Sequence, residues 1–122
     1  MILVQKFPRA WDKITCINFL QRRIILNSIA YYELNSPQIT DREYDELSKQ
    51  LVELQSDSDI DVNETQYGYC MYDFDGSTGF HLYDRLSESD KEYLIGIAHV
   101  GIRELGKLDE KPKKKKRKGG LF

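Results

Sequence analysis

Residues 31–47 read YYELNSPQITDREYDEL, and this stretch decides how the first half of the chain folds. Pro37 cannot continue a helical hydrogen-bond ladder and biases the residue before it away from helical geometry, so a preceding helix must end ahead of it. Thr40 and Glu43 have the spacing of a capping box, which predicts that a new helix begins at Asp41. The stretch therefore predicts a turn between two helices.

The sequence on both sides of this turn has helical periodicity. Between residues 12 and 34, apolar side chains that share one helical face are Ile14, Ile17, Leu20, Ile24 and Tyr31. After the turn, the apolar side chains that share one face are Tyr44, Leu47, Leu51 and Leu54. The two faces predict a helical hairpin over residues 12–55, with a loop of about five residues between the helices.

Two aromatic-rich runs follow an acidic linker at residues 56–64. QYGYCMYDF (66–74) and FHLYDRL (80–86) flank the segment DGSTG. A short connection that contains glycine is typical of the turn between two strands. We therefore expect a small β-hairpin over residues 66–86.

A third helix is predicted over residues 88–106. Ser87 stands where an N-cap residue is expected, the apolar positions recur with helical spacing, and Gly106 is a suitable terminator. Gly96 and Gly101 either weaken this helix or let a neighbouring element approach closely. The expected fold class is mainly α: a helical hairpin, a small β-hairpin and a third helix, followed by a disordered basic tail.

Charge divides the chain into two parts. Residues 1–110 hold all 20 acidic side chains and carry a charge of −9, whereas the basic tail, residues 111–122, carries +7. A run of like charges repels itself and stays unfolded, so we expect residues 1–110 to form a single small domain and the tail to extend from it. Cys16 and Cys70 lack the spacing of a metal site or a disulfide framework, which predicts two reduced thiols.

The tail suggests contacts with nucleic acid or protein. PKKKKRK (112–118) has the composition of a nuclear localisation signal and equally of a nucleic-acid tether, and a merely solubilising tail is a third interpretation. The terminal Leu-Phe resembles the end of peptides that bind the bacterial sliding clamp. The candidate nucleic-acid or partner-binding residues are Lys113, Lys114, Lys115, Lys116, Arg117, Lys118, Leu121 and Phe122. No apolar run is long enough to cross a membrane, so we expect a cytoplasmic protein, in a bacterial host cell if it is phage-encoded, and no membrane partner.

The turn itself has two interpretations. Tyr31 and Tyr44 can simply staple the helices together, with Asp41 and Asp45 as acids of a first helical turn. The pattern Tyr-Tyr, Asn, Pro, Asp, Tyr-Asp, Leu over residues 31–47 also resembles the N-terminal, NMN-binding helical domain of bacterial NAD-dependent DNA ligases. The second half of the chain is similar to small ligase-related proteins of bacteriophages.

This resemblance implies a site for NMN or NAD. The cofactor-binding residues that it implies are Tyr31, Tyr32, Asp41, Tyr44 and Asp45. A positively charged pyridinium is attracted to an aromatic face by about 0.5–2 kcal/mol, and carboxylates add complementary charge.

The implied site differs from the ligase motif at one residue, and it needs a second wall that the helical hairpin does not provide. Asn35 stands where the ligases usually have aspartate. A helical hairpin offers only one wall of a pocket, so the opposing wall would have to come from a partner protein or from the predicted β-hairpin of residues 66–86, whose tyrosines make this possible. These are Tyr67, Tyr69, Tyr72 and Tyr83.

Catalysis and metal binding are not expected. Ligation needs a nucleophilic lysine in a Lys-x-Asp-Gly motif, whereas the Asp-Gly of this chain, Asp75-Gly76, has no lysine beside it. Residues 73–84 have Thr78 and Asp84 at the sixth and twelfth positions, where a calcium loop requires glycine and glutamate, and His81 and His99 are expected to be structural. We predict a non-catalytic nicotinamide-nucleotide-binding protein; the alternative is an interaction protein of DNA metabolism that acts through its tail.

Overall fold

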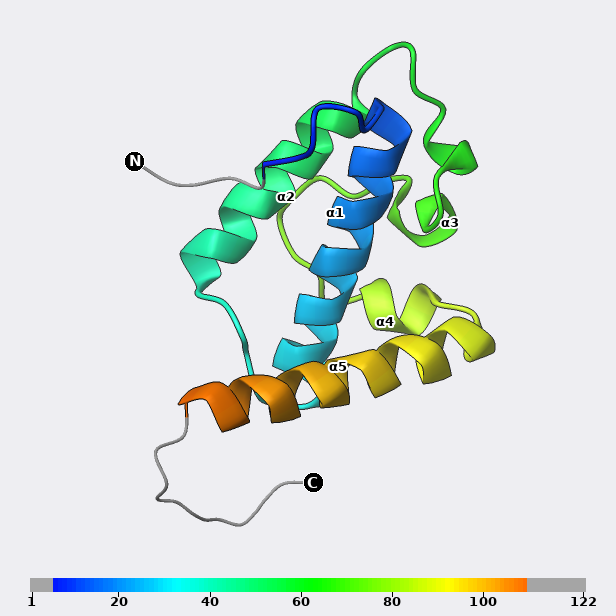
Figure 1. The fold of residues 1–122 in the computed structure, drawn as a ribbon. Helices are drawn as coiled ribbons and strands as arrows, with labels where there is room; N and C mark the ends of the chain where they lie inside the picture. The colour runs from blue at the N-terminus through cyan, green and yellow to red at the C-terminus, as the bar shows by residue number, and fades with distance from the viewer. Residues whose placement is uncertain (1–5, 110–122) are drawn as a thin grey trace.

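The computed structural model describes residues 6–109, with side chains described as far as Ile102. Its elements are α1 (Lys13–Ser28), η1 (Ile29–Glu33), α2 (Asp41–Gln55), η2 (Val62–Glu64), α3 (Gly68–Met71), α4 (Leu82–Arg85) and α5 (Glu88–Asp109). Figure 1 shows α1 and α2 as a hairpin, with α3 beside α1. Helix α5 lies below α4 and crosses the end of the hairpin where α1 is followed by η1. Within residues 6–109, no helix is both long enough and apolar enough to span a membrane.

The predicted helical hairpin is confirmed. Ile17, Leu20 and Ile24 of α1 are fully buried and belong to one apolar cluster with Leu47 and Leu51 of α2. The same cluster extends into the second half of the chain through side chains of α3, α4 and α5. Burial of these side chains stabilises the fold by about 1.5–3 kcal/mol each.

The predicted capping box is also present. The Thr40 hydroxyl accepts a hydrogen bond from the Glu43 backbone N–H at 3.0 Å, and the Glu43 carboxylate accepts one from the Thr40 N–H at 2.9 Å. These reciprocal bonds satisfy two backbone donors that would otherwise lack partners at the start of a helix. Asp41, the first residue of α2, therefore has a fixed position.

The end of the first helix differs from the prediction. After Ser28 the backbone widens into the π-helical turn η1, in which the Leu34 N–H donates to the Ile29 carbonyl. A π turn holds more residues per turn, so it rotates the side chains that follow relative to the face of α1. Ile29 is buried as a result, and Tyr31, which was predicted on the apolar face, is 46% exposed.

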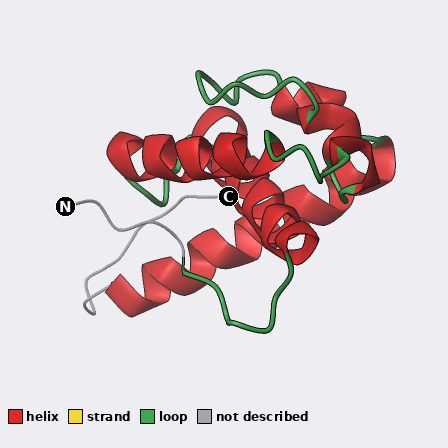
Figure 2. Cartoon of the chain, turned by 90° about the horizontal axis from the view of Figure 1, so that it is seen from above, coloured by secondary structure: helices red, strands yellow, loops and turns green. Residues whose placement is uncertain are grey.

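The predicted β-hairpin over residues 66–86 is wrong. Residues 6–109 contain no strand (Figure 2), and this segment forms the short helices α3 and α4 joined by an irregular turn. Over α3 and its two cap residues, the buried side chains are Tyr67, Cys70 and Met71, a helical spacing, whereas Tyr69 and Tyr72 are exposed. The aromatic content suggested strands, but the positions that meet the core follow a helical period.

Side-chain amides of α1 and α2 bind the backbone that a strand partner would have bound. Asn18 Oδ1 accepts a hydrogen bond from the Gln66 N–H at 2.7 Å, and Gln55 Nε2 donates to the Met71 carbonyl at 3.3 Å. Every buried backbone group needs such a partner. Helices of the hairpin therefore hold this segment without a sheet.

Gln21 makes the central bonds of this kind. Its side chain is fully buried; Nε2 donates to Gln55 Oε1 at 2.9 Å and to Thr65 Oγ1 at 2.8 Å, and Oε1 accepts from the Tyr67 N–H at 2.9 Å. A buried amide with all these bonds made is stable, whereas a buried unpaired donor is costly. Gln21 thereby joins α1 to the end of α2 and to the start of the second half.

The third helix is confirmed and extends further than predicted, to Asp109 instead of Gly106. Ser87 caps it, since its hydroxyl accepts a hydrogen bond from the Asp90 N–H at 3.2 Å. A Cβ at Gly96 or Gly101 would meet nothing within 4 Å in the described part of the chain, so of the two alternatives given for these glycines the close approach of a neighbour is not observed there. Cys16 and Cys70 are free thiols, both buried, as expected. Residues 111–122, the predicted basic tail, lie outside the described residues.

Replacing Gln21 tests the hydrogen bonds that join the two halves. Gln21→Leu keeps the volume but leaves the Tyr67 N–H without its acceptor and the Thr65 hydroxyl with only its bond to the Val62 carbonyl, so we expect the free energy of unfolding to fall by about 1–3 kcal/mol in urea titrations. The matched control is Gln66→Leu, whose side chain is exposed; it should change stability by less than about 0.5 kcal/mol. Equal effects of the two variants would contradict the role given to Gln21.

Candidate functional site

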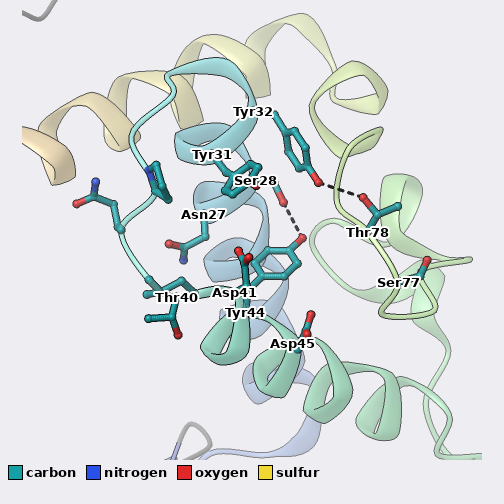
Figure 3. Close-up of a pocket in the computed structure, with 13 residues that line it drawn as sticks. Asn27, Ser28, Tyr31, Tyr32, Thr40, Asp41, Tyr44, Asp45, Ser77 and Thr78 are labelled. Carbon is teal, nitrogen blue, oxygen red and sulfur yellow. Dashed lines mark hydrogen bonds between the residues drawn. The ribbon is translucent and has the colours of Figure 1, made fainter.

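A cavity of about 270 Å³ lies where the helical hairpin turns (Figure 3). Its walls come from the end of α1, from η1, from the loop before α2, from the first turns of α2 and from the irregular turn of the second half. The residues that line it are Asn27, Ser28, Tyr31, Tyr32, Pro37, Gln38, Ile39, Thr40, Asp41, Tyr44, Asp45, Ser77 and Thr78.

All five predicted cofactor-binding residues line this cavity. They come from two elements: Tyr31 and Tyr32 from η1, and Asp41, Tyr44 and Asp45 from the first turns of α2. The side chains of Tyr31 and Tyr32 are 46% and 41% exposed, so their rings are accessible to a ligand. The π turn and the capping box together place residues that are nine or more positions apart around one space.

Tyr44 is the most deeply held of the five. Its hydroxyl lies 2.8 Å from the Ser28 hydroxyl, across the two helices of the hairpin. Burial raises the pKa of the Tyr44 phenol to about 12, because the charged phenolate would lose contact with water. Tyr44 therefore presents a neutral aromatic ring over the whole physiological pH range.

Tyr31 and Tyr32 form an edge-to-face pair with ring centroids 4.8 Å apart. Tyr32 also reaches the second half of the chain, because its hydroxyl lies 3.2 Å from Thr78 Oγ1 and its ring packs against Phe80 at 5.3 Å. These contacts hold the Tyr32 ring at the rim of the cavity and leave part of it exposed.

The electrostatic character of the cavity is acidic. Of the 13 residues that line it, Asp41 and Asp45 carry carboxylates, and none is Lys, Arg or His. Asn35, which replaces the aspartate usual in the ligases, does not line the cavity. It has a φ of 53°, a left-handed conformation that asparagine tolerates better than most residues, and it follows Leu34, the C-cap residue of η1.

Residues 12–59 match the family model of the DNA ligase-like, N-terminal NAD+-binding domain. This confirms the predicted resemblance for what we call the ligase-like segment, residues 12–59. No curated protein and no solved structure matched the chain. The ligase-like segment contains all five predicted cofactor-binding residues and both helices of the hairpin.

The opposing wall of the cavity lies outside the ligase-like segment, within residues 66–86, which were one of its two expected sources; the residues that form it were not predicted. It consists of Ser77 and Thr78. The sequence signal that could have found them is DGSTG itself, in which small polar residues stand between two glycines that allow close approach to another element.

The four tyrosines that were candidates for the opposing wall do not line the cavity. Tyr67 is buried in the core, and the Tyr69 hydroxyl accepts a hydrogen bond from the Ser87 N–H at the start of α5. Arg85 lies over the ring of Tyr72 and Lys91 over that of Tyr83. These tyrosines serve the packing of the second half.

The described part of the chain has no cluster of three or more His, Cys, Asp or Glu side chains that could hold a metal ion. The carboxylates of residues 73–75 have protein partners: Asp73 pairs with Arg85 at 2.6 Å, and Asp75 accepts from the Ser77 hydroxyl at 2.6 Å. The tail residues predicted to bind nucleic acid or a partner lie outside the described residues, so those contacts stay a prediction.

Alkaline titration tests the burial of Tyr44. Its pKa is raised from 10.0 to about 12, so the neutral phenol favours the folded state; this stability is complete below pH 10 and is lost as pH rises toward about 12. We expect Tyr44→Phe to be less stable by about 1 kcal/mol at neutral pH, where it lacks the bond to Ser28, and to lose less stability across the alkaline window. Urea unfolding at a series of pH values measures both effects.

The matched control is Tyr93→Phe, because Tyr93 is 55% exposed. This variant should follow the wild-type stability curve between pH 10 and about pH 12. A Tyr44→Phe curve parallel to that of the wild type would show that Tyr44 is not the buried phenol described above.

Proposed function

We propose that this chain binds the nicotinamide half of NMN or NAD in the cavity formed by Tyr31, Tyr32, Asp41, Tyr44 and Asp45. The observation that carries the proposal is that these five side chains, all from the ligase-like segment, line one cavity. If these residues only held the two helices of the hairpin together, the bond between Tyr44 and Ser28 would be enough. This role would not require two further rings and two carboxylates to face the same space.

The chemistry of the lining suits a cationic ring. The oxidised nicotinamide ring is a positively charged pyridinium, which tyrosine faces attract by the cation–π effect. Asp41 and Asp45 add negative charge, and their oxygens can accept hydrogen bonds from sugar hydroxyls or a carboxamide. Because no basic side chain lines the cavity, it is less suited to a phosphate, which would lie toward the solvent.

The size of the cavity agrees with part of a dinucleotide. Ligand pockets commonly measure about 300–1,000 Å³, so a cavity of about 270 Å³ is slightly below this range. It can enclose a nicotinamide ring with its ribose. The adenylate half of NAD would extend beyond it.

We propose further that the chain binds the nucleotide without catalysing its transfer. Adenylation requires a lysine nucleophile beside Asp-Gly. Asp75-Gly76 instead forms the turn at the cavity, where Asp75 accepts hydrogen bonds from the N–H and the hydroxyl of Ser77. Such a protein would sense or sequester the nucleotide.

Isothermal titration tests the proposal. We expect NMN and NAD to bind with Kd values between about 10 μM and 1 mM, in keeping with a small, open cavity. NADH, whose reduced ring is neutral, should bind about two- to thirtyfold more weakly than NAD, since it lacks the cation–π attraction. No heat of binding with NMN or NAD at millimolar concentration would refute the proposal.

Charge-neutralising variants locate the binding. The double variant Asp41→Asn/Asp45→Asn should weaken NMN binding about three- to tenfold, because it removes both carboxylates from the lining. The double variant Asp59→Asn/Glu92→Gln removes the same charge from exposed positions outside the cavity and serves as the control. Equal affinities of the two double variants would place the binding elsewhere.

The charge segregation of the sequence favours a second candidate function, a DNA-metabolism interaction protein that acts through its tail. Seven of the 18 basic residues of the chain lie between positions 111 and 118. If the tail binds DNA, deletion of residues 111–122 should abolish retention on a DNA column, and wild-type retention should fall steeply with salt because it depends on phosphate contacts. If the protein without residues 111–122 were retained on DNA and on the sliding clamp as well as the wild type is, this candidate would be excluded.

A further inference from the structure

The turn at residues 75–80 lies outside the ligase-like segment, yet it closes one side of the cavity (Figure 3). It reaches the cavity from the second half of the chain, between α3 and α4. Ser77 and Thr78 are its two residues that line the cavity, and both carry hydroxyl groups. The ligase-like segment therefore forms only part of the cavity.

Two features hold the first part of this turn. Gly76 has a φ of +85°, a conformation that side chains other than glycine rarely adopt, and a Cβ there would already be in contact with Val52 of α2. The Asp75 carboxylate accepts hydrogen bonds from the Ser77 N–H at 2.9 Å and from its hydroxyl at 2.6 Å. The Ser77 side chain is thereby fixed next to the cavity.

Gly79 brings the turn against the base of the cavity. A Cβ at this position would overlap both the Tyr44 hydroxyl and the Ser28 hydroxyl, so only glycine fits while these two groups keep their places. The bond between Tyr44 and Ser28 thus lies directly under the turn. Such close contact makes the turn a wall of the cavity and not a loop that merely passes near it.

Thr78 joins this wall to the other side of the cavity. Its hydroxyl lies 3.2 Å from the Tyr32 hydroxyl and accepts a hydrogen bond from the Phe80 N–H at 3.2 Å, and the Phe80 ring packs edge-on against Tyr32. The turn and η1 therefore meet at the rim. The cavity has two walls made by one chain.

We propose that Ser77 and Thr78 are ligand-contacting residues of the nucleotide site, whose hydroxyls bond the ribose and make the site complete without a partner protein. The inference rests on the proposed nicotinamide-nucleotide function. A one-walled site would leave much of a small ligand in water, and the second wall removes that limitation. Serine and threonine hydroxyls both donate and accept, which matches the hydroxyls of a sugar.

Binding of NMN to full-chain variants tests this role by isothermal titration. Ser77→Ala and Thr78→Val each remove one hydroxyl, and each should weaken NMN binding about three- to tenfold. Ser58→Ala, an exposed serine outside the cavity, is the control and should bind as the wild type does. Circular dichroism melting curves should show every variant folded.

Tyr32→Phe separates a ligand contact from a structural link. This variant breaks the bond to Thr78 but keeps the threonine hydroxyl free to bond a ligand, so we expect it to bind NMN more tightly than Thr78→Val does. If Thr78 only positions Tyr32, the two variants will lose the same affinity and Ser77→Ala will lose none. That result would overturn the inference.

Amide chemical shifts give an independent measurement. Addition of NMN should move the backbone amide signals of residues 76–79 together with those of residues 41–45. Shifts confined to residues 27–45, with wild-type affinity in Ser77→Ala and Thr78→Val, would overturn the second wall and leave the proposed function intact. Failure of the wild type to bind NMN at all would instead refute the proposed function.

Discussion

The structure depends most on the fully buried side chain of Gln21. Its amide bonds Gln55 on α2, the Thr65 hydroxyl and the backbone N–H of Tyr67, so α1, the end of α2 and residues 65–67 meet at one group. A buried amide is stable only when its donors and acceptor are all satisfied, and each of these partners has one geometry that does so. Gln21 therefore sets the position of the second half of the chain against the helical hairpin.

This position determines the cavity. One wall comes from η1 and the start of α2, which the hairpin orders by itself, and the other comes from Ser77 and Thr78, which reach it only because the second half is held in place. Gly79 lets the two walls meet with no side chain between them. The ligase-like segment is thus joined here to a second wall from the same chain.

The five motif residues could be predicted because their placement is local. Tyr31 and Tyr32 end one helix, and Asp41, Tyr44 and Asp45 begin the next, so a proline turn and a capping box are enough to bring them together. Ser77 and Thr78 could not be predicted in this way. Nothing within DGSTG indicates which distant element it faces, and the aromatic runs around it favoured a β-hairpin that the structure does not contain.

The sequence by itself determined the hairpin, its turn, the capped starts of α2 and α5, and the candidate binding residues, because capping bonds and helical periodicity involve neighbours along the chain. Only the tertiary structure decided the helical form of residues 66–86, the π turn that exposes Tyr31, and the second wall of the cavity. These features depend on which backbone groups and apolar faces meet across the core. The amides of Asn18, Gln21 and Gln55 favour the helical form. They bind the N–H groups of Gln66 and Tyr67 and the carbonyl of Met71, so this backbone has partners without a sheet.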